Sequence, residues 1–119
     1  MSILRSLPAY ALLLALLAAP ALLLAHSGVT ATVPADGAAL DEAPASIAVR
    51  FDAPVRITRF VLEGADGEVP LAARPDGQPN DRFETAPDGA LPAGDYRVSW
   101  RALAADGHVM SGAFSFSVR

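Results

Sequence analysis

The 119-residue sequence contains no cysteine and no lysine, and its nine basic residues are all arginine. Without cysteine, the chain can form neither a disulfide framework nor a thiolate metal site. The formal charge of −4 at pH 7 argues against binding to nucleic acid or to an anionic membrane. Ten prolines and nine glycines divide the chain into short segments, which is more typical of a β protein than of a helical one.

The longest uncharged run lies at the N-terminus. Arg5 precedes 19 residues without a charge, Leu7 to Ala25, and this run ends in small residues. The pattern predicts a secretory signal peptide over residues 1–25, and export of a cysteine-free domain suits a bacterial periplasm. The alternative is an uncleaved membrane anchor, because about 20 apolar residues can span a bilayer. Pro20 and the alanine-rich end favour the signal peptide.

Two cleavage sites remain open in this segment. Cleavage after Ala21 fits the rule of small residues better and would leave Leu22 at the new N-terminus. Cleavage after Ala25 fits less well because of Leu23, but it makes His26 the first residue. The metal chemistry considered below favours Ala25, and the mature domain is then residues 26–119.

Apolar and polar residues alternate along most of the mature chain, and no segment after residue 26 has a sustained period of 3.6. The expected strands cover residues 29–33, 47–51, 57–64, 68–73, 82–85, 96–102 and 114–118. Residues 34–38 are expected to form a turn. The strand expected at residues 47–51 should end at residues 52–54. Seven short strands in one small domain predict an all-β fold, an antiparallel Greek-key β-sandwich.

Aromatic residues near the C-terminus are expected to build the core. Trp100, Phe114 and Phe116 occupy alternating positions and bury large apolar areas. Tyr96 follows Leu91 and Gly94 in the pattern of a tyrosine corner, in which the phenol donates a hydrogen bond to upstream backbone. It can equally be an alternating core aromatic, and both interpretations make it structural.

The two histidines of the chain are His26 and His108. Asp106 and His108 stand two residues apart, so their side chains can project to the same side, and Gly107 between them adds no bulk. A first-residue His26 would offer its α-amine and its ring Nδ1 to one metal ion. With an Asp106 oxygen and a His108 nitrogen, these donors make the N,O set that Cu(II) prefers in tetragonal geometry.

Each half of this pattern also has an ordinary explanation. An Asp-Gly turn followed by a surface histidine is common, and a histidine can follow a signal peptide by accident. The joint pattern is stronger because both histidines of the chain fall at these two places. From the residues alone, a metal site and an ordinary turn both remain open.

The mature chain resembles the CopC family of periplasmic copper-resistance proteins. The resemblance starts at His26, directly after the signal peptide, and its most specific part is the last block. The matching stretches are VPADGA (33–38), IAVRFDAPV (47–55) and LPAGDYRVSWRALAADGHVMSGAFSFSV (91–118).

The resemblance implies a cupredoxin-like or Ig-like sandwich that holds one Cu(II) ion per chain through His26 (amine and ring), Asp106 and His108. Members of the family often carry an acid one position after Asp52, where this chain has alanine. Alternation would turn Asp52 to the other face, so we do not assign it as a ligand. A single thioether, Met110, cannot make a soft Cu(I) site, and we expect it to pack.

The sequence therefore predicts a periplasmic Cu(II)-binding protein, not an enzyme, that buffers or carries copper as a monomer. Its partner would be a CopD-type inner-membrane protein, and it would bind no nucleic acid. One alternative is a copper-dependent oxidative enzyme of the histidine-brace type, which would need an open coordination position and a broad substrate face. The other is a metal-free β-sandwich used in adhesion or assembly, whose stability would not depend on copper.

Overall fold

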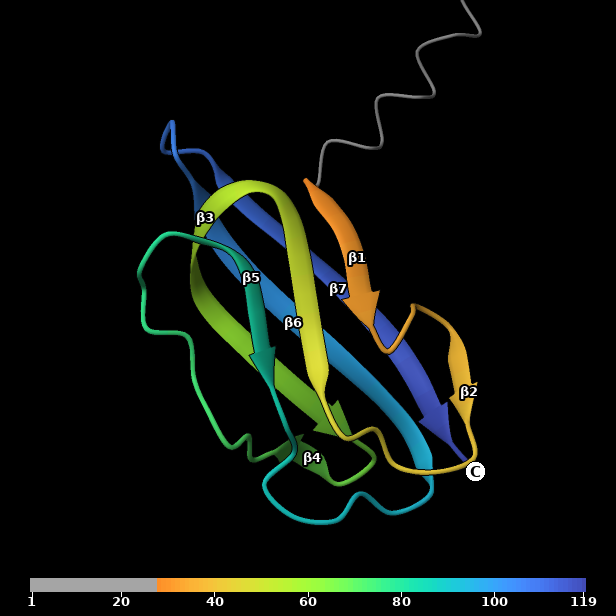
Figure 1. Cartoon of the computed structure of the whole chain (residues 1–119). Coiled ribbons are helices and arrows are strands. Elements are labelled where there is room, and N and C mark those ends of the chain that lie inside the picture. Colours follow the sequence, from red (N-terminus) through yellow and green to blue (C-terminus); the bar gives the residue numbers. More distant parts are fainter. Residues whose placement is uncertain (1–27) are drawn as a thin grey trace, which may run out of the picture.

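The computed structural model describes residues 28–119, which form seven β-strands (Figure 1). No helix in this part of the chain is long and apolar enough to cross a membrane. The strands are β1 (Val29–Val33), β2 (Ala38–Leu40), β3 (Ile47–Gly64), β4 (Gly67–Val69), β5 (Asn80–Thr85), β6 (Gly94–Ala104) and β7 (Val109–Val118).

The long strand β3 belongs to both layers of the fold. Its first half pairs with β1 and β5, and its second half pairs with β6 and β4. The second layer continues from β6 to β7 and then to β2. Figure 1 shows β3 arching over at one end of the molecule as it passes from one layer to the other. The all-β, seven-stranded architecture is therefore as expected.

The expected end of a strand at residues 52–54 is wrong, because β3 runs without interruption through this segment. The pairing with β5 shifts register between Arg50 and Val55. Asp52, Ala53 and Pro54 are all exposed at this bend, where Pro54 interrupts no regular ladder of hydrogen bonds. The segment thus bends a strand instead of ending it.

The prediction of a purely antiparallel sandwich is also wrong, because β2 pairs with β7 in parallel. Residues 34–37 do not reverse the chain; they carry it from β1, beside β3, to the free edge of β7. The N–H of Gly37 donates to the carbonyl of Ser115 (2.7 Å), and the Ser115 N–H donates to Asp36 Oδ1 (2.9 Å). Because the chain does not turn back between β1 and β2, β2 runs in the same direction as β1. This is also the direction of β7, so β2 and β7 pair in parallel (Figure 1).

The remaining strands lie close to their expected positions. The strand expected at residues 68–73 is shorter as β4, which ends before Pro70, a residue without an N–H for a ladder. Leu71 keeps an isolated bridge to Pro87. Strands β5, β6 and β7 include the expected segments and extend beyond them.

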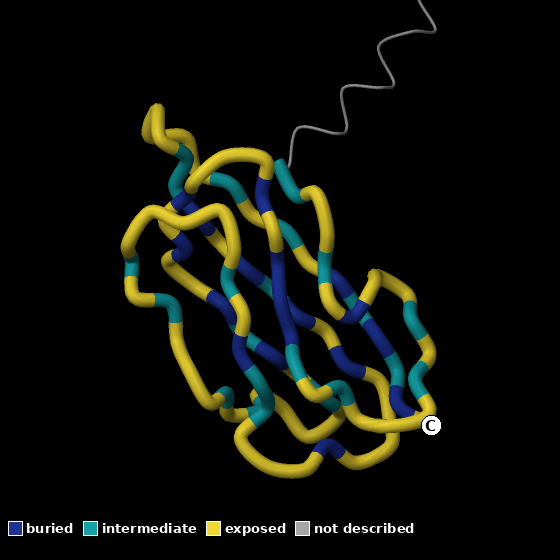
Figure 2. The backbone as a smooth tube through the Cα atoms, in the orientation of Figure 1, coloured by how far each residue is buried: buried dark blue, intermediate teal, exposed yellow. Residues whose placement is uncertain are grey.

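The core lies between the two layers and is built from alternating residues of β3, β6 and β7 (Figure 2). The rings of Phe51 and Trp100 meet edge to face with centroids 5.1 Å apart, and those of Tyr96 and Phe116 stack at 5.4 Å. The Tyr96 hydroxyl donates to the carbonyl of Pro92. This hydrogen bond confirms the tyrosine corner, while Tyr96 is also a buried core residue.

Candidate metal centre

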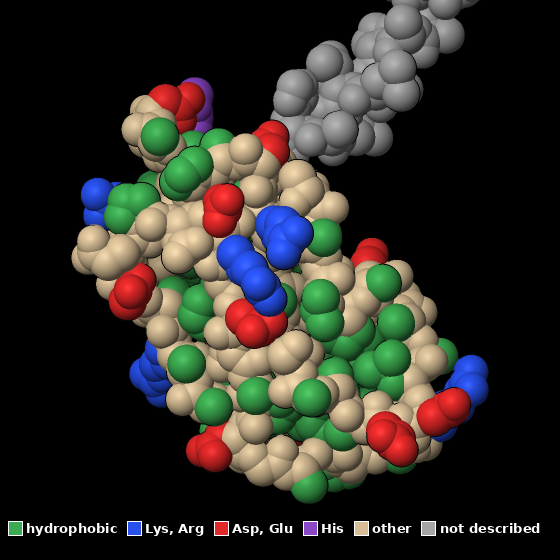
Figure 3. Space-filling view, viewed as in Figure 1, with side chains coloured by type: hydrophobic (Ala, Val, Ile, Leu, Met, Phe, Trp, Pro, Cys, Tyr) green, Lys and Arg blue, Asp and Glu red, His purple; other side chains and the backbone are tan. Residues whose placement is uncertain are grey.

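The hairpin between β6 and β7 positions two of the predicted ligands. The N–H of Ala104 donates to the carbonyl of His108 (2.8 Å), and the N–H of Gly107 donates to the carbonyl of Ala104 (2.9 Å). These two bonds close the turn, so Asp106 and His108 are presented together at its tip. Figure 3 shows an acidic side chain and a histidine side by side at the end of this hairpin.

The tripeptide Ala-Asp-Gly occurs three times in the sequence, at residues 35–37, 65–67 and 105–107. Each copy forms a turn, and its glycine has a positive φ of +82°, +110° or +91°, a backbone conformation that glycine adopts at no steric cost. Ala-Asp-Gly is thus a general turn element of this chain. The third copy differs because a histidine follows it.

Asp106 and His108 are hydrogen-bonded to each other twice. The backbone N–H of His108 donates to Asp106 Oδ1 (3.1 Å), and His108 Nδ1 lies 2.6 Å from Asp106 Oδ2. The two side chains are 63% and 83% exposed, respectively. The pair is therefore pre-arranged and open to solvent, as a site that exchanges a metal ion requires.

The hydrogen bonds set the ionisation and the free donors of the pair. The His108 amide, and next to it the His108 ring, hold the pKa of the Asp106 carboxyl below its ordinary value. A ring that donates through Nδ1 keeps the lone pair of Nε2 available, and each carboxylate oxygen can accept more than one bond. Asp106 can therefore bind a metal directly or orient His108 for it, as carboxylates beside metal-bound histidines do.

The first described residues lie at the same end of the molecule as this hairpin. Figure 1 shows the start of β1, the arch of β3 and the tip of the β6–β7 hairpin together at that end. The N–H of Asp52 donates to the carbonyl of Gly28 (2.8 Å), which fixes the start of β1 against the arch. His26, the third predicted ligand, lies outside the described residues.

Two side chains that the sequence left out of the site lie beside Gly28. A Cβ placed on Gly28 would be 2.9 Å from Met110 Cε and 3.3 Å from Asp52 Oδ1. Asp52 is exposed and its neighbour Phe51 is buried, so Asp52 lies near the start of β1 and outside the core. Met110 is partly buried and packs against the core, as expected.

Within residues 28–119, no group of three His, Cys, Asp or Glu side chains could hold a metal ion. The described part brings together Asp106 and His108 and supplies no third ligand beside them. A complete site on this hairpin would therefore need donors from outside residues 28–119.

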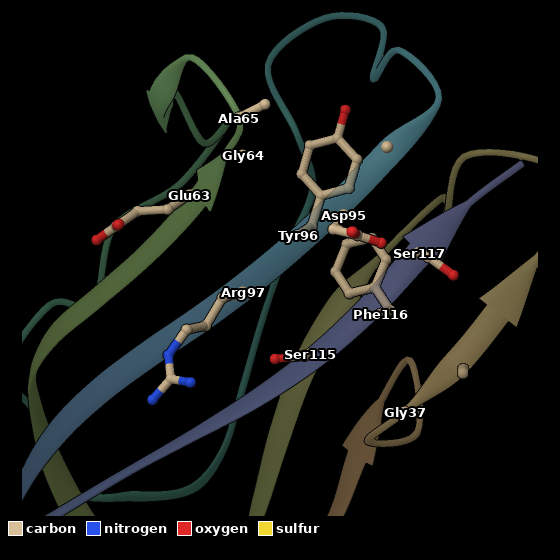
Figure 4. A pocket seen from close by; sticks show the side chains of 12 residues that line it. Gly37, Glu63, Gly64, Ala65, Asp95, Tyr96, Arg97, Ser115, Phe116 and Ser117 are labelled. Carbon is tan, nitrogen blue, oxygen red and sulfur yellow. The ribbon is translucent and has the colours of Figure 1, made fainter.

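A surface hollow of about 790 Å³ lies at the other end of the β6–β7 pair (Figure 4). Tyr96 and Phe116 lie side by side in it, and Glu63 and Arg97 extend from neighbouring strands. None of the predicted ligands lines this hollow. A metal ion needs converging donors and not a large cavity, so the hollow does not compete with the hairpin as a metal site.

The chain was compared with families and proteins already known. A family model described as the CopC domain matches residues 29–119. Copper resistance protein C of Escherichia coli is 32% identical over 78 residues, which cover 62% of this chain and 60% of that protein's length.

Solved structures show the same fold. The crystal structure of PcoC, a methionine-rich copper resistance protein from Escherichia coli, is 29% identical with a TM-score of 0.61, covering 76% of this chain and 96% of that one. The structure of CopC from Methylosinus trichosporium OB3b has a TM-score of 0.62 at 21% identity, over 76% of this chain and 90% of that one. At that identity the second likeness concerns the fold alone.

Proposed function

Because the chain belongs to the CopC family, we propose that it is a periplasmic protein that binds one Cu(II) ion and buffers or carries copper. Residues 1–25 act as the signal peptide, and cleavage after Ala25 makes His26 the first residue. The copper ion is cargo in this proposal, and the protein is not an enzyme. A CopD-type inner-membrane protein is the partner that would receive the ion.

The observation that carries the proposal is the hydrogen-bonded Asp106–His108 pair at the exposed hairpin tip. Copper would be bound there by a ring nitrogen of His108, an Asp106 oxygen, and the α-amine and ring nitrogen of His26. Three nitrogens and one oxygen form the tetragonal set that favours Cu(II). The Asp106 carboxylate, whose pKa the His108 amide and ring hold below its ordinary value, is ionised near neutral pH and has no proton to lose when copper binds.

The chain has few of the soft sulfur ligands that Cu(I) prefers. Of its two methionines, Met1 belongs to the proposed signal peptide and Met110 packs against the core. A soft Cu(I) site needs several thioether or thiolate ligands. We therefore propose a protein specific for Cu(II), in contrast to the methionine-rich PcoC.

A competition titration with Cu(II) tests the proposal on the secreted protein. The expected result is one tight equivalent, which His108→Ala and Asp106→Ala each weaken by about 10-fold or more. Asp66→Ala is the matched control, because Asp66 is the aspartate of an identical Ala-Asp-Gly turn with no histidine after it. Equal affinity of the His108→Ala variant and the parent would overturn the site.

A second comparison tests the role of the N-terminus. A chain that begins at Ala25 retains the His26 ring but moves the free amine one residue away. It is expected to bind Cu(II) more weakly than the chain that begins at His26. Mass spectrometry of the secreted protein establishes which N-terminus is natural, and a natural start at Leu22 would remove the amine ligand from the proposal.

A further inference from the structure

Two pairs of arginines stand directly opposite each other across neighbouring strands. Arg50 on β3 faces Arg82 on β5, and Arg59 on β3 faces Arg101 on β6. Like charges in this position destabilise a sheet. Both pairs therefore require an explanation in a chain whose net charge is −4.

The first pair is compensated within the protein. Arg82 Nη2 lies 2.6 Å from Glu84 Oε2, and Figure 3 shows basic side chains with an acidic one beside them over this face. The second pair is not compensated: in residues 28–119, no acidic side chain forms an ion pair with Arg59 or Arg101. Among residues 28–119, the charge of this pair is therefore left without an ion-pair partner.

The surroundings of the second pair offer hydrogen-bond donors. Arg59, Arg101, Ser99 and Ser111 line one hollow of about 340 Å³ on the outward face of β3, β6 and β7. Both arginines and Ser111 are exposed. The planar guanidinium group of arginine can donate two parallel hydrogen bonds to the two oxygens of one carboxylate. The hollow thus suits carboxylate groups.

Acidic residues lie farther along the same face and do not cancel the pair. Arg97, the third arginine lining this hollow, stands opposite Glu63, which in turn faces Glu68 on β4. Glu68 also lines a neighbouring hollow with Arg59 and Arg74. None of these groups forms an ion pair among the described residues, but the acids adjoin Arg97 while the Arg59–Arg101 pair lies nearer the hairpin.

This face continues into the hairpin that carries His108. Leu103 on β6 pairs with Val109 on β7, two residues along from the Arg101–Ser111 pair. Residues two apart in a strand lie on the same side of the sheet. Val109 is 67% exposed. Among the described residues, it and Val33 are the two large hydrophobic residues that are exposed. A partner seated on the arginines would therefore touch Val109 and reach the candidate copper site.

We infer that the outward face formed by Arg59, Arg101, Leu103, Ser111 and Val109 docks an extended acidic segment of a partner protein, with an apolar side chain against Val109. We call these five residues the arginine face. An anionic membrane fits less well, because each arginine near such a surface contributes about 1 kcal/mol against the repulsion of a chain with net charge −4. That the partner exchanges copper rests on the proposed function; the docking itself does not.

The test is an NMR titration of the copper-free secreted protein with the capped peptide Ac-Glu-Ala-Glu-Leu-Glu-NH₂ at low salt. The expected shifts are confined to backbone amides near the arginine face, and they weaken as salt is added. The double variant Arg59→Gln/Arg101→Gln should bind about 10-fold more weakly, because it removes the two positive charges that attract the glutamates of the peptide and pair with them.

The matched control is Arg50→Gln/Arg82→Gln, which removes the same charge from the other layer and should bind the peptide like the parent. Equal weakening of both double variants would overturn the proposal, because bulk charge would then explain binding. So would equal binding of a peptide with Gln in place of Glu, or binding to phosphatidylglycerol vesicles without binding to the peptide. Cu(II) affinity of the parent protein is measured in parallel. A parent that binds Cu(II) but not the peptide refutes the arginine face alone, and a parent that binds the peptide but not Cu(II) refutes the proposed function alone.

Discussion

Single residues decide whether the turn after β6 is a structural element or a binding site. The chain uses Ala-Asp-Gly turns three times, and His108 follows one of them. The spacing of Asp106 and His108 predicted that their side chains would project together, and the structure shows them hydrogen-bonded. The sequence could not reveal that both Asp106 oxygens accept bonds from His108, because this depends on the closed geometry of the turn.

The ionisation of Asp106 can be tested without copper. Its pKa lies below the ordinary value because the His108 amide, and after it the His108 ring, donate to the carboxylate. A carboxyl with a lowered pKa in the folded state stabilises the fold above its unfolded pKa, and that contribution is lost as the pH falls through the folded value. We expect the ¹³C resonance of the Asp106 carboxyl to titrate below the ordinary range of an aspartate.

The variant His108→Ala separates the two causes of this shift. It retains the backbone N–H and removes the ring, so the pKa of Asp106 should rise only part of the way toward its ordinary value. An Asp106 that titrates in the parent protein as an ordinary aspartate does would contradict the hydrogen-bonded pair.

At the scale of elements, alternation predicted the middle of each long strand and failed where a strand changes layer. Residues 52–54 contain proline and an acid, which usually end a strand, yet β3 bends there because its two halves find partners in different layers. The same bend places Asp52 next to Gly28. The parallel pairing of β2 with β7 also could not be predicted from the sequence, because a local pattern does not specify which distant strand a short strand pairs with.

Close packing of β6 against β7 gives a stability prediction. A Cβ on Gly112 would lie 2.5 Å from Trp100 Cζ2 and 2.8 Å from Trp100 Cε2, and Trp100 is buried. The variant Gly112→Ala should lower the free energy of unfolding by about 1–3 kcal/mol, the usual cost of overpacking.

Urea denaturation measures this change, and Ala113→Ser on the exposed neighbouring position is the control. A surface substitution of this kind usually changes stability by no more than about 0.5 kcal/mol. If the Gly112→Ala variant unfolds at the same urea concentration as the parent, the contact between the two strands is described wrongly.

For the whole molecule, composition and strand count predicted an all-β sandwich, and the family resemblance supplied the hypothesis that the sandwich binds Cu(II). The fold brings the start of β1, the arch of β3 and the His108 hairpin to one end (Figure 1). A small domain without disulfides depends on its core, so a ligand that binds the native state alone should stabilise it measurably.

Copper should therefore raise the thermal midpoint of the secreted protein. An excess of Cu(II) at about 100 times its dissociation constant would add about 2.7 kcal/mol, and a chelator should return the midpoint to that of the metal-free protein. The Asp66→Ala variant should respond like the parent, whereas His108→Ala should respond weakly. A midpoint that does not move with copper would favour a metal-free role.

The central claim is that the N-terminus and the β6–β7 hairpin hold one Cu(II) ion together. Electron paramagnetic resonance of the secreted protein with one equivalent of Cu(II) tests this most directly, because nitrogen couplings report the donors. The account predicts a tetragonal spectrum with three coupled nitrogens, reduced to two in the His108→Ala variant. The same spectrum in both proteins, or that of unbound Cu(II) in the parent, would contradict it.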